Sequence, residues 1–310
     1  MSTIVCCGLS PTVQRTLTFA GQVRPGSVNR AASVSTTASG KAANVARMIA
    51  QLGGKSHLVH PLAGETGRLV QRLLSEDGVI QSIYWMETGL TRTCTTILAG
   101  ETTELVEEAP ELTPDAMLAI ENMLDERLRS ARMLCLSGSF PRGIPTEWYA
   151  KWVARAREAG VPAMVDAQQA PLRACLSERP WLVKPNRTEA IATLGLASDA
   201  SPMDAAQALL DLGAQNALVS DGPQGAIFAN ANTMLRVVPP ALPAVNPIGS
   251  GDALAAGIAA HWVNSAVDWS DTLRSGFAAA AANCHTLTSG VVDPSTVERY
   301  RGLVAIDRVG

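Results

Sequence analysis

Residues 246–252, with the sequence Asn-Pro-Ile-Gly-Ser-Gly-Asp, combine a flexible turn with a carboxylate just ahead of a helix-forming stretch. The two glycines allow a tight turn that exposes backbone N–H groups. The stretch that follows, 253–263, is rich in alanine and contains no proline, which predicts a helix. Free N–H groups and the helix dipole at such an N-terminus attract anions. The turn is therefore a candidate site for a phosphate group.

Asp252 lies at the edge of this predicted anion site. A carboxylate repels phosphate, and a chemical role explains its presence there. It can accept the proton of a hydroxyl group that attacks a bound phosphoryl group. The alternative is structural, in which Asp252 only caps the helix. This segment by itself leaves both interpretations open.

Two common phosphate-binding loops are absent from the sequence. No segment has the pattern G-x-x-x-x-G-K-[ST], which excludes a P-loop NTPase. A dinucleotide-binding G-x-G-x-x-G would need a glycine at Leu254, and that loop normally follows the first strand instead of lying near the C-terminus. The sequence therefore disfavours a nicotinamide-dependent oxidoreductase.

The composition is that of a globular protein long enough to bury a large core. The chain has 310 residues, of which 47% are hydrophobic and 17% charged, and its net charge is −3. No basic stripe indicates nucleic-acid binding, and no run of about 18 apolar residues predicts a membrane span. The six cysteines form no C-x-x-C pair, and the N-terminus does not resemble a signal peptide. We therefore expect free thiols in a cytoplasmic protein.

The elements that must position the turn alternate between strands and helices. Predicted buried strands lie near 3–7, 56–61, 133–137, 163–166, 181–184 and 217–220. The first predicted helix, 40–52, carries apolar residues at i, i+3, i+4 and i+7 from Val45. This alternation predicts an α/β fold with a Rossmann-like, mostly parallel sheet that has helices on both faces.

Two β-prone segments, about 11–38 and 80–110, do not fit the alternation. We expect them to pair into a small second sheet that stands off the main sheet as a β lid. The whole chain, 1–310, is then expected to form a single α/β domain with this lid. Because unpaired strand edges are usually paired or covered, we also expect a homodimer with contacts between lids.

Polar loops follow the predicted strands, and in an open α/β sheet such loops meet at the edge where ligands bind. They are 64–67 (GETG), 137–141 (SGSFP), 184–189 (KPNRTE) and 220–225 (SDGPQG), and they are joined by 39–44 (SGKAAN), which opens the first predicted helix. Together with 246–252, their order and spacing resemble the ribokinase-like (PfkB) carbohydrate kinase family over nearly the whole chain. The resemblance is closest to the 1-phosphofructokinase and tagatose-6-phosphate kinase branch.

This resemblance implies an enzyme that transfers a phosphoryl group from ATP, with Mg²⁺, to a hydroxyl group of a sugar or sugar phosphate. Asp252 matches the general base, and the anion-binding turn is formed by Gly249, Ser250 and Gly251. Asn186 and Glu189 match a motif that organises Mg²⁺ through water. The other residues implied to bind the nucleotide are Lys184, Ser220, Gly222, Gly225 and Asn283. Those implied to bind the acceptor are Gln14, Gly40, Lys41, Asn44, Arg92 and Ser139, with Lys41 and Arg92 as the cations for its phosphate.

The sequence departs from the family pattern on the acceptor side. Gln14 stands in place of an acid, Ser39 and Ala42 in place of glycines, and Cys94 in place of an asparagine, and the strand near 163–166 ends in Asp-Ala-Gln-Gln. Because the phosphoryl-transfer side is retained, we expect an active kinase with a changed acceptor. The alternative is a sugar-phosphate-binding regulator with little or no activity. A glutamine can donate as well as accept, so Gln14 predicts an acceptor with a carbonyl or acid oxygen where the usual sugars have a hydroxyl.

Structural alternatives remain for several of these residues. Lys41 is also compatible with a solvated first-turn lysine, Arg92 with an ordinary edge-strand charge, and Glu189 with a first-turn helix carboxylate. His57 and His60 flank a predicted strand and lack a third ligand nearby, so no metal site is expected there.

Overall fold

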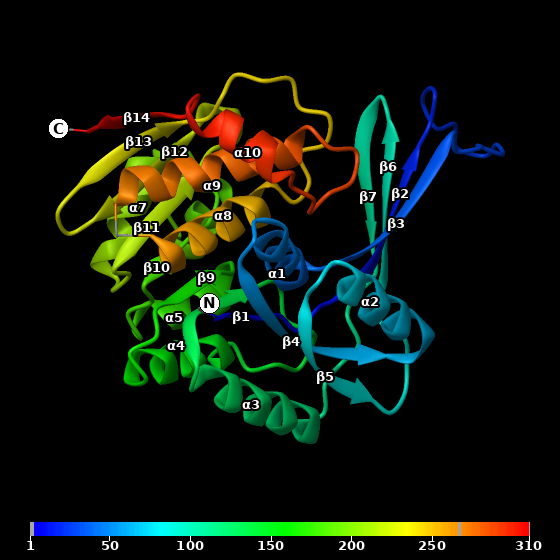
Figure 1. Ribbon diagram of the computed structural model, residues 1–310, viewed down its shortest axis with the longest axis horizontal. Helices are drawn as coiled ribbons and strands as arrows, with labels where there is room; N and C mark the ends of the chain where they lie inside the picture. Colours follow the sequence, from blue (N-terminus) through cyan, green and yellow to red (C-terminus); the bar gives the residue numbers. More distant parts are fainter. Residues whose placement is uncertain (1–2, 266–267, 310) are drawn as a thin grey trace.

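The computed structural model describes residues 3–265 and 268–309, which form a large sheet between two layers of helices and a small sheet beside it (Figure 1). The large sheet has the strand order β14-β13-β12-β11-β10-β9-β8-β1-β4-β5. Its strands are β1 (Thr3–Cys7), β4 (Lys55–Ala63), β5 (Ile80–Met86), β8 (Ala131–Ser137), β9 (Ala163–Asp166), β10 (Leu182–Val183), β11 (Asn216–Ser220), β12 (Ala226–Asn230), β13 (Met234–Val238) and β14 (Ala305–Arg308). The strands from β5 to β11 run parallel, and β12, β13 and β14 are antiparallel to their neighbours.

Helices cover both faces of this sheet, as the sequence predicts. One layer contains α1 (Lys41–Gln51), α2 (Gly64–Glu76), α8 (Ser250–Asn264), α9 (Trp269–Cys284) and α10 (Pro294–Arg301). The other contains α3 (Pro114–Leu128), α4 (Trp148–Glu158), α5 (Gln169–Leu176), α6 (Arg187–Leu194) and α7 (Pro202–Asp211). A short 3-10 helix, η1, spans Gly222–Gln224. Strand β1 shows why the central strands are apolar throughout: alternate side chains enter the two cores, Cys6 on one face and Cys7 on the other.

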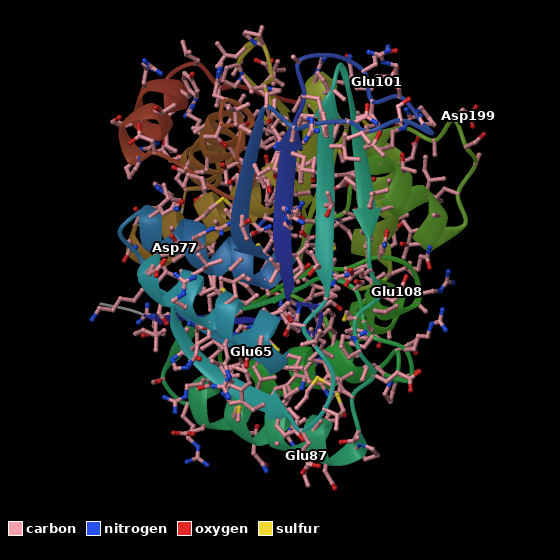
Figure 2. All side chains as sticks on the ribbon, turned by 90° about the vertical axis from the view of Figure 1, so that its right-hand side faces the viewer. Glu65, Asp77, Glu87, Glu101, Glu108 and Asp199 are labelled. Atoms are coloured by element: carbon pink, nitrogen blue, oxygen red, sulfur yellow. The ribbon has the colours of Figure 1, made fainter. Side chains whose placement is uncertain are left out.

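The predicted second sheet is confirmed, with the order β3-β2-β6-β7. We call this four-stranded sheet the lid sheet, and its strands are β2 (Thr12–Thr18), β3 (Ser33–Ser39), β6 (Thr93–Ala99) and β7 (Glu101–Val106). Figure 2 shows its strands side by side, with Glu101 at one end of β7 and Glu108 just beyond the other. Strand β3 leads directly into α1, so the lid sheet is joined to the start of the first long helix.

The structure differs from the prediction at two edge strands. The prediction placed residues 80–86 in the lid, but β5 pairs parallel with β4 at the edge of the large sheet. As an edge strand it is only partly buried, which gives it the same polar alternation as a lid strand. The exposed edge strand β14, which follows the end of α10 at Arg301, is absent from the predicted strands.

No helix within the described ranges 3–265 and 268–309 is long and apolar enough to cross a membrane.

Candidate active site

The glycine turn ahead of α8 has the left-handed backbone that its sequence suggests. Gly249 has a φ of +80°, and a Cβ atom at this position would lie 3.0 Å from the backbone nitrogen of Gly290. Asn246 braces the turn, because its Oδ1 accepts a hydrogen bond of 3.0 Å from the backbone N–H of Ile248. Both the backbone conformation and the close approach therefore require glycine at position 249.

Asp252 lies in the first turn of α8 and is 6% exposed. Its Oδ2 accepts a hydrogen bond of 2.8 Å from Nδ2 of Asn44, and no backbone N–H of the described residues donates to its carboxylate. The interpretation that Asp252 only caps the helix is therefore wrong. Burial raises the pKa of Asp252 to about 6, and the negative charge of Asp166 adds to this increase while Lys41 opposes it. A carboxyl group with a pKa near neutrality is suited to accept a proton during a reaction.

A cluster of opposite charges lies next to Asp252. Asp166, at the carboxyl end of β9, is 3.1 Å from Nζ of Lys41 and 3.3 Å from Nζ of Lys184. Burial acts to raise the pKa of Asp166, but the two lysine charges outweigh it and hold that pKa below its usual value. The same ion pair raises the pKa of Lys41. The ion pair thus keeps Lys41 charged, and both lysine side chains are held against Asp166 in the candidate site.

Asp166 is a residue that the sequence analysis did not assign to the site. Its signals were its position as an acid at the end of a predicted strand, where ligand-binding loops begin, and the place of that strand end on the acceptor side of the family pattern. The sequence does not show that two lysines from distant segments share this one carboxylate.

Asn186 and Glu189 form a capping box at the start of α6. The Asn186 side chain accepts from the backbone N–H of Glu189 at 2.8 Å, and Oε2 of Glu189 accepts from the backbone N–H of Asn186 at 2.9 Å. The structural alternative for Glu189 is therefore present, but it uses only one carboxylate oxygen. The other, Oε1, lies 4.0 Å from Nζ of Lys41 and faces the same cavity.

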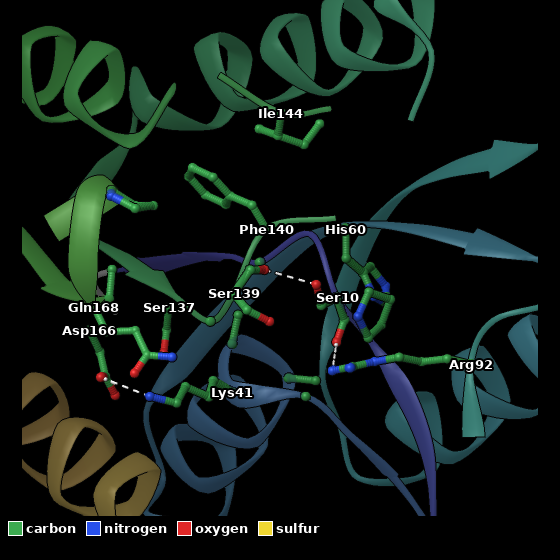
Figure 3. A pocket seen from close by; sticks show the side chains of 18 of the residues that line it. Ser10, Lys41, His60, Arg92, Ser137, Ser139, Phe140, Ile144, Asp166 and Gln168 are labelled. Atoms are coloured by element: carbon green, nitrogen blue, oxygen red, sulfur yellow. Dashed lines mark hydrogen bonds and ion pairs between the residues drawn. The ribbon is translucent and has the colours of Figure 1, made fainter. Parts of the chain in front are cut away.

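One cavity of about 640 Å³ brings most of the predicted residues together. It joins the glycine turn, the capping box and part of the lid sheet. Its predicted lining residues are Gln14, Gly40, Lys41, Asn44, Arg92, Lys184, Asn186, Glu189, Ser220, Gly222, Gly249, Ser250, Gly251 and Asp252. A second cavity of about 670 Å³ shares Gly40, Lys41, Arg92 and Asp166 with the first, and it adds Ser139 (Figure 3).

Two predicted nucleotide-binding residues do not line either cavity. Gly225 has a φ of +98°, and a Cβ atom there would lie 2.1 Å from the carbonyl oxygen of Val237, so it permits the tight start of a hairpin. Asn283 is fully buried and donates to the carbonyl of Ile248 at 2.8 Å while accepting from the N–H of Gly290 at 2.7 Å. From outside the cavities, Asn283 stabilises the glycine turn and Gly225 shapes the loop that follows β11.

The acceptor side is built where the lid sheet meets the start of α1. Arg92 donates from Nη2 to the carbonyl of Ser10 at 3.0 Å and from Nη1 to the carbonyl of Glu107 at 3.1 Å, and Ser10 in turn donates to the carbonyl of Ser139 at 2.8 Å. These contacts hold the guanidinium at the border of the two cavities (Figure 3). Lys41 points away from Arg92 toward Asp166, so the two cations predicted to hold one phosphate are directed to different parts of the site.

The Gln14 amide has only one orientation that fits its surroundings. Its nitrogen Nε2 lies 2.9 Å from Oγ1 of Thr96 and 3.2 Å from the carbonyl oxygen of Arg15, which can only accept. Oε1 has no donor among the described residues and remains available to a ligand. Gln14 therefore offers the cavity a hydrogen-bond acceptor, as an acid at this position would.

A model of the pfkB family of carbohydrate kinases matches residues 1–295. The chain belongs to this family. As a pfkB member it is a carbohydrate kinase, and its mostly parallel sheet with a separate small sheet is the ribokinase-like fold predicted from the sequence.

Solved structures of pfkB kinases superpose on nearly the whole chain. Escherichia coli phosphofructokinase-2 in complex with fructose-6-phosphate is 26% identical, with 97% of this chain and 99% of that chain covered and a TM-score of 0.88. A possible 1-phosphofructokinase from Thermotoga maritima, 20% identical, covers 99% and 100% with a TM-score of 0.90. A carbohydrate kinase from Agrobacterium tumefaciens, 22% identical, covers 99% and 100% with a TM-score of 0.77. The last two establish the shared fold.

Proposed function

We propose that this carbohydrate kinase transfers the γ-phosphoryl group of ATP to a hydroxyl group of a sugar phosphate, with Asp252 as general base. The observation that carries the proposal is the position of Asp252: a buried carboxylate with a raised pKa beside the glycine turn of α8, in a cavity shared with Lys41 and Lys184. The alternative, a sugar-phosphate-binding regulator without activity, gives no reason to keep a raised-pKa base beside two fixed cations.

In the proposed reaction the acceptor hydroxyl loses its proton to Asp252 as its oxygen forms a bond to the γ-phosphorus. The bond from that phosphorus to the oxygen bridging to the β-phosphate breaks, and ADP leaves. Lys41 and Lys184, together with the N–H groups of the glycine turn, stabilise the negative charge on the transferring group.

The chemistry of the site suits a magnesium ion that retains most of its water ligands. Glu189 has one carboxylate oxygen, Oε1, outside the capping box. Glu189 and Asn186 line the same cavity. Mg²⁺ prefers oxygen ligands, and phosphate-binding enzymes usually hold it through one or two carboxylates plus the substrate phosphates. When bound, the ion would neutralise charge on the nucleotide phosphates.

The fixed Arg92 and the acceptor atom of Gln14 favour an acceptor that carries both an anionic group and a hydroxyl group. The sequence-based expectation of a carbonyl or acid oxygen opposite Gln14 is not supported, because both Nε2 contacts are already made within the protein. The relative from Escherichia coli was solved with fructose-6-phosphate, which fits this class of acceptor.

A panel of sugar phosphates and the matching free sugars, assayed for ADP release with ATP and Mg²⁺, tests the proposed function. We expect a phosphorylated hexose to have kcat/KM at least about tenfold higher than its free sugar, since one charge-assisted hydrogen bond contributes roughly 1.5–3 kcal/mol. Gln14→Leu should lower kcat/KM for the best sugar phosphate, and Gln207→Leu, which alters an exposed glutamine outside both cavities, serves as the control. Absence of turnover with every member, combined with measurable sugar-phosphate binding, would establish the regulator instead.

The lid sheet predicts self-association. Val34 and Leu105 are 53% and 55% exposed, and their strand registers place both on the face opposite Gln14. We expect a homodimer at micromolar concentration in sedimentation velocity, and we expect Leu105→Lys to shift it to monomer. Leu118→Lys, at a similarly exposed position on α3, is the matched control. A tetrameric form of the Escherichia coli relative has been solved. A monomeric wild-type protein would contradict the prediction of a homodimer.

A further inference from the structure

Arg47, on α1, is one of the most deeply buried side chains of the protein, at 1% exposure. Four of its five N–H donors make hydrogen bonds to surrounding residues. Nε donates to the carbonyl of Gly290 at 2.7 Å and Nη1 to the carbonyl of Ala38 at 2.6 Å. Nη2 donates to the carbonyl of Ser289 at 3.2 Å and to Oδ1 of Asn44 at 3.0 Å.

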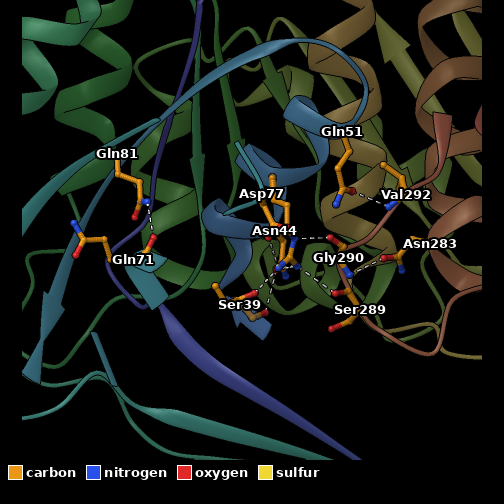
Figure 4. Close-up of polar contacts among 12 residues, drawn as sticks. Ser39, Asn44, Gln51, Gln71, Asp77, Gln81, Asn283, Ser289, Gly290 and Val292 are labelled. Carbon is orange, nitrogen blue, oxygen red and sulfur yellow. Dashed lines mark hydrogen bonds and ion pairs between the residues drawn. The ribbon is translucent and has the colours of Figure 1, made fainter. Parts of the chain in front are cut away.

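The contact with Asn44 matters because this asparagine is the hydrogen-bond partner of Asp252. Oδ1 of Asn44 accepts from Arg47 and also from the hydroxyl of Ser39, at 3.1 Å. Nδ2 of the same amide donates to Asp252 at 2.8 Å. Figure 4 shows Ser39, Asn44, Ser289 and Gly290 gathered around this network.

If the side-chain amide of Asn44 were flipped, so that its nitrogen and oxygen exchanged places, the contacts at both ends of the amide would be unfavourable. Its NH₂ group would face the guanidinium of Arg47, and its carbonyl oxygen would face the carboxylate of Asp252. Arg47 and Ser39 therefore act on the same atom to fix which end of the amide meets the base.

The backbone around Arg47 is shaped to permit this contact. Gly290 has a φ of +71°, and a Cβ atom there would lie 2.3 Å from Nη2 of Arg47 and 2.8 Å from Oδ1 of Asn44. Gly290 is also the residue against which Gly249 of the anion-binding turn packs. The network thus joins the turn, the loop at 289–290 and α1 around one buried arginine.

We propose that Arg47 is a positioning residue for the base: it holds the Asn44 amide so that Nδ2 donates to Asp252, and Ser39 shares this role. The inference rests on the proposed function of Asp252. Donation from Asn44 favours the carboxylate form of Asp252 and leaves its other oxygen, Oδ1, to the acceptor hydroxyl. The charged groups that also face Asp252 are Asp166, Lys41 and Lys184. The charge of Arg47 itself interacts with Asp252, and Asp77 lies 3.7 Å from Nη1 of Arg47.

The test is the pH dependence of kcat/KM in Arg47→Lys and Ser39→Ala. Lysine retains the positive charge but has no fork of donors that can reach both the loop carbonyls and Asn44. A weakened Asn44–Asp252 hydrogen bond favours protonation of the base, so the acid limb should move to higher pH by about one unit in Arg47→Lys and by a smaller amount in Ser39→Ala. Activity lost at pH 6.5 should largely return at pH 8.5.

Two comparisons separate positioning from a general loss of stability. Ser56→Ala removes a buried hydroxyl of β4 that donates to the carbonyl of Ala46 at 2.7 Å. Ala46 is on α1, as Arg47 is, but this contact does not involve Asn44, so the variant should leave the pH profile unchanged. In an Asn44→Ala background, Arg47→Lys should cause no further shift of the acid limb, because the amide through which it acts is absent.

An unchanged acid limb in both Arg47→Lys and Ser39→Ala would overturn the inference. So would a shift in Arg47→Lys that persists in the Asn44→Ala background. Either result would leave the proposed function intact as long as Asp252→Asn remains inactive. Normal turnover by Asp252→Asn would instead remove the proposed function itself.

Discussion

Asp252→Asn is expected to lower kcat by about 10²–10⁴, with little change in nucleotide affinity, because it removes a general base while preserving size. Asparagine retains a polar group opposite Asn44, so the fold around the site should persist. Rapid-quench or coupled measurement of kcat, together with a binding isotherm for ATP, checks both parts of the prediction.

The matched control is Asp293→Asn. Asp293 caps α10 by accepting from the backbone N–H of Thr296 at 2.9 Å, and it lines neither cavity. Asparagine is as good an N-cap as aspartate and position 293 lies outside both cavities, so the control should leave kcat nearly unchanged. Near-normal turnover by Asp252→Asn would falsify the assignment of the base.

The pH profile of kcat/KM for the wild-type enzyme should reflect the ionisation of the Asp252 carboxyl group. Since burial raises the pKa of Asp252 to about 6, the base is deprotonated above that pH and protonated below it. The profile of kcat/KM reports groups of the free enzyme, so it should fall on the acid side with an apparent pKa of about 6. A profile that stays flat down to pH 5 would contradict a base in this environment.

The sequence predicts those parts of the site that depend on local backbone geometry. A glycine turn followed by a proline-free alanine-rich stretch has few conformations open to it, and Gly249 adopts the left-handed one at the start of α8. The loops after β4, β8, β10 and β11 were identifiable because parallel strands end at one edge of the sheet. Strands buried on both faces are apolar throughout, which made the large sheet recognisable.

What the sequence could not provide was the pairing of distant polar groups. Whether Lys41 faces Arg92 or Asp166 depends on side-chain direction at the start of α1, and both orientations agree with the same pattern of residues. The Arg47 network joins residues separated by more than 200 positions, and an arginine inside a helix reads as a solvated charge until its surroundings are known. Strand β5 was misassigned because edge strands and lid strands have the same half-exposed pattern.

Lys41→Met should lower kcat by about 10²–10³ and change the acceptor KM little, as expected for the loss of one group that stabilises the transferring charge. The reason is its position: Nζ lies 3.1 Å from Asp166 and 4.0 Å from Glu189, on the side of Asp252 and of the residues proposed to hold magnesium. Asp166 keeps its second partner, Lys184, at 3.3 Å, so the variant should remain folded. Steady-state kinetics with the best sugar phosphate, varied against fixed saturating ATP, measures kcat and KM separately.

Arg92→Leu, in contrast to Lys41→Met, is expected to change the acceptor KM more than kcat. Its guanidinium is held at the border of the two cavities by carbonyls of Ser10 and Glu107, away from Asp166, so it is placed to bind the acceptor's own phosphate. Loss of a charge-assisted contact of roughly 1.5–3 kcal/mol should raise the acceptor KM about tenfold or more, with a smaller effect on kcat. If Lys41→Met instead raises the acceptor KM tenfold at unchanged kcat, then Lys41 turns toward the acceptor when substrate binds, and the sequence-based role for it is correct.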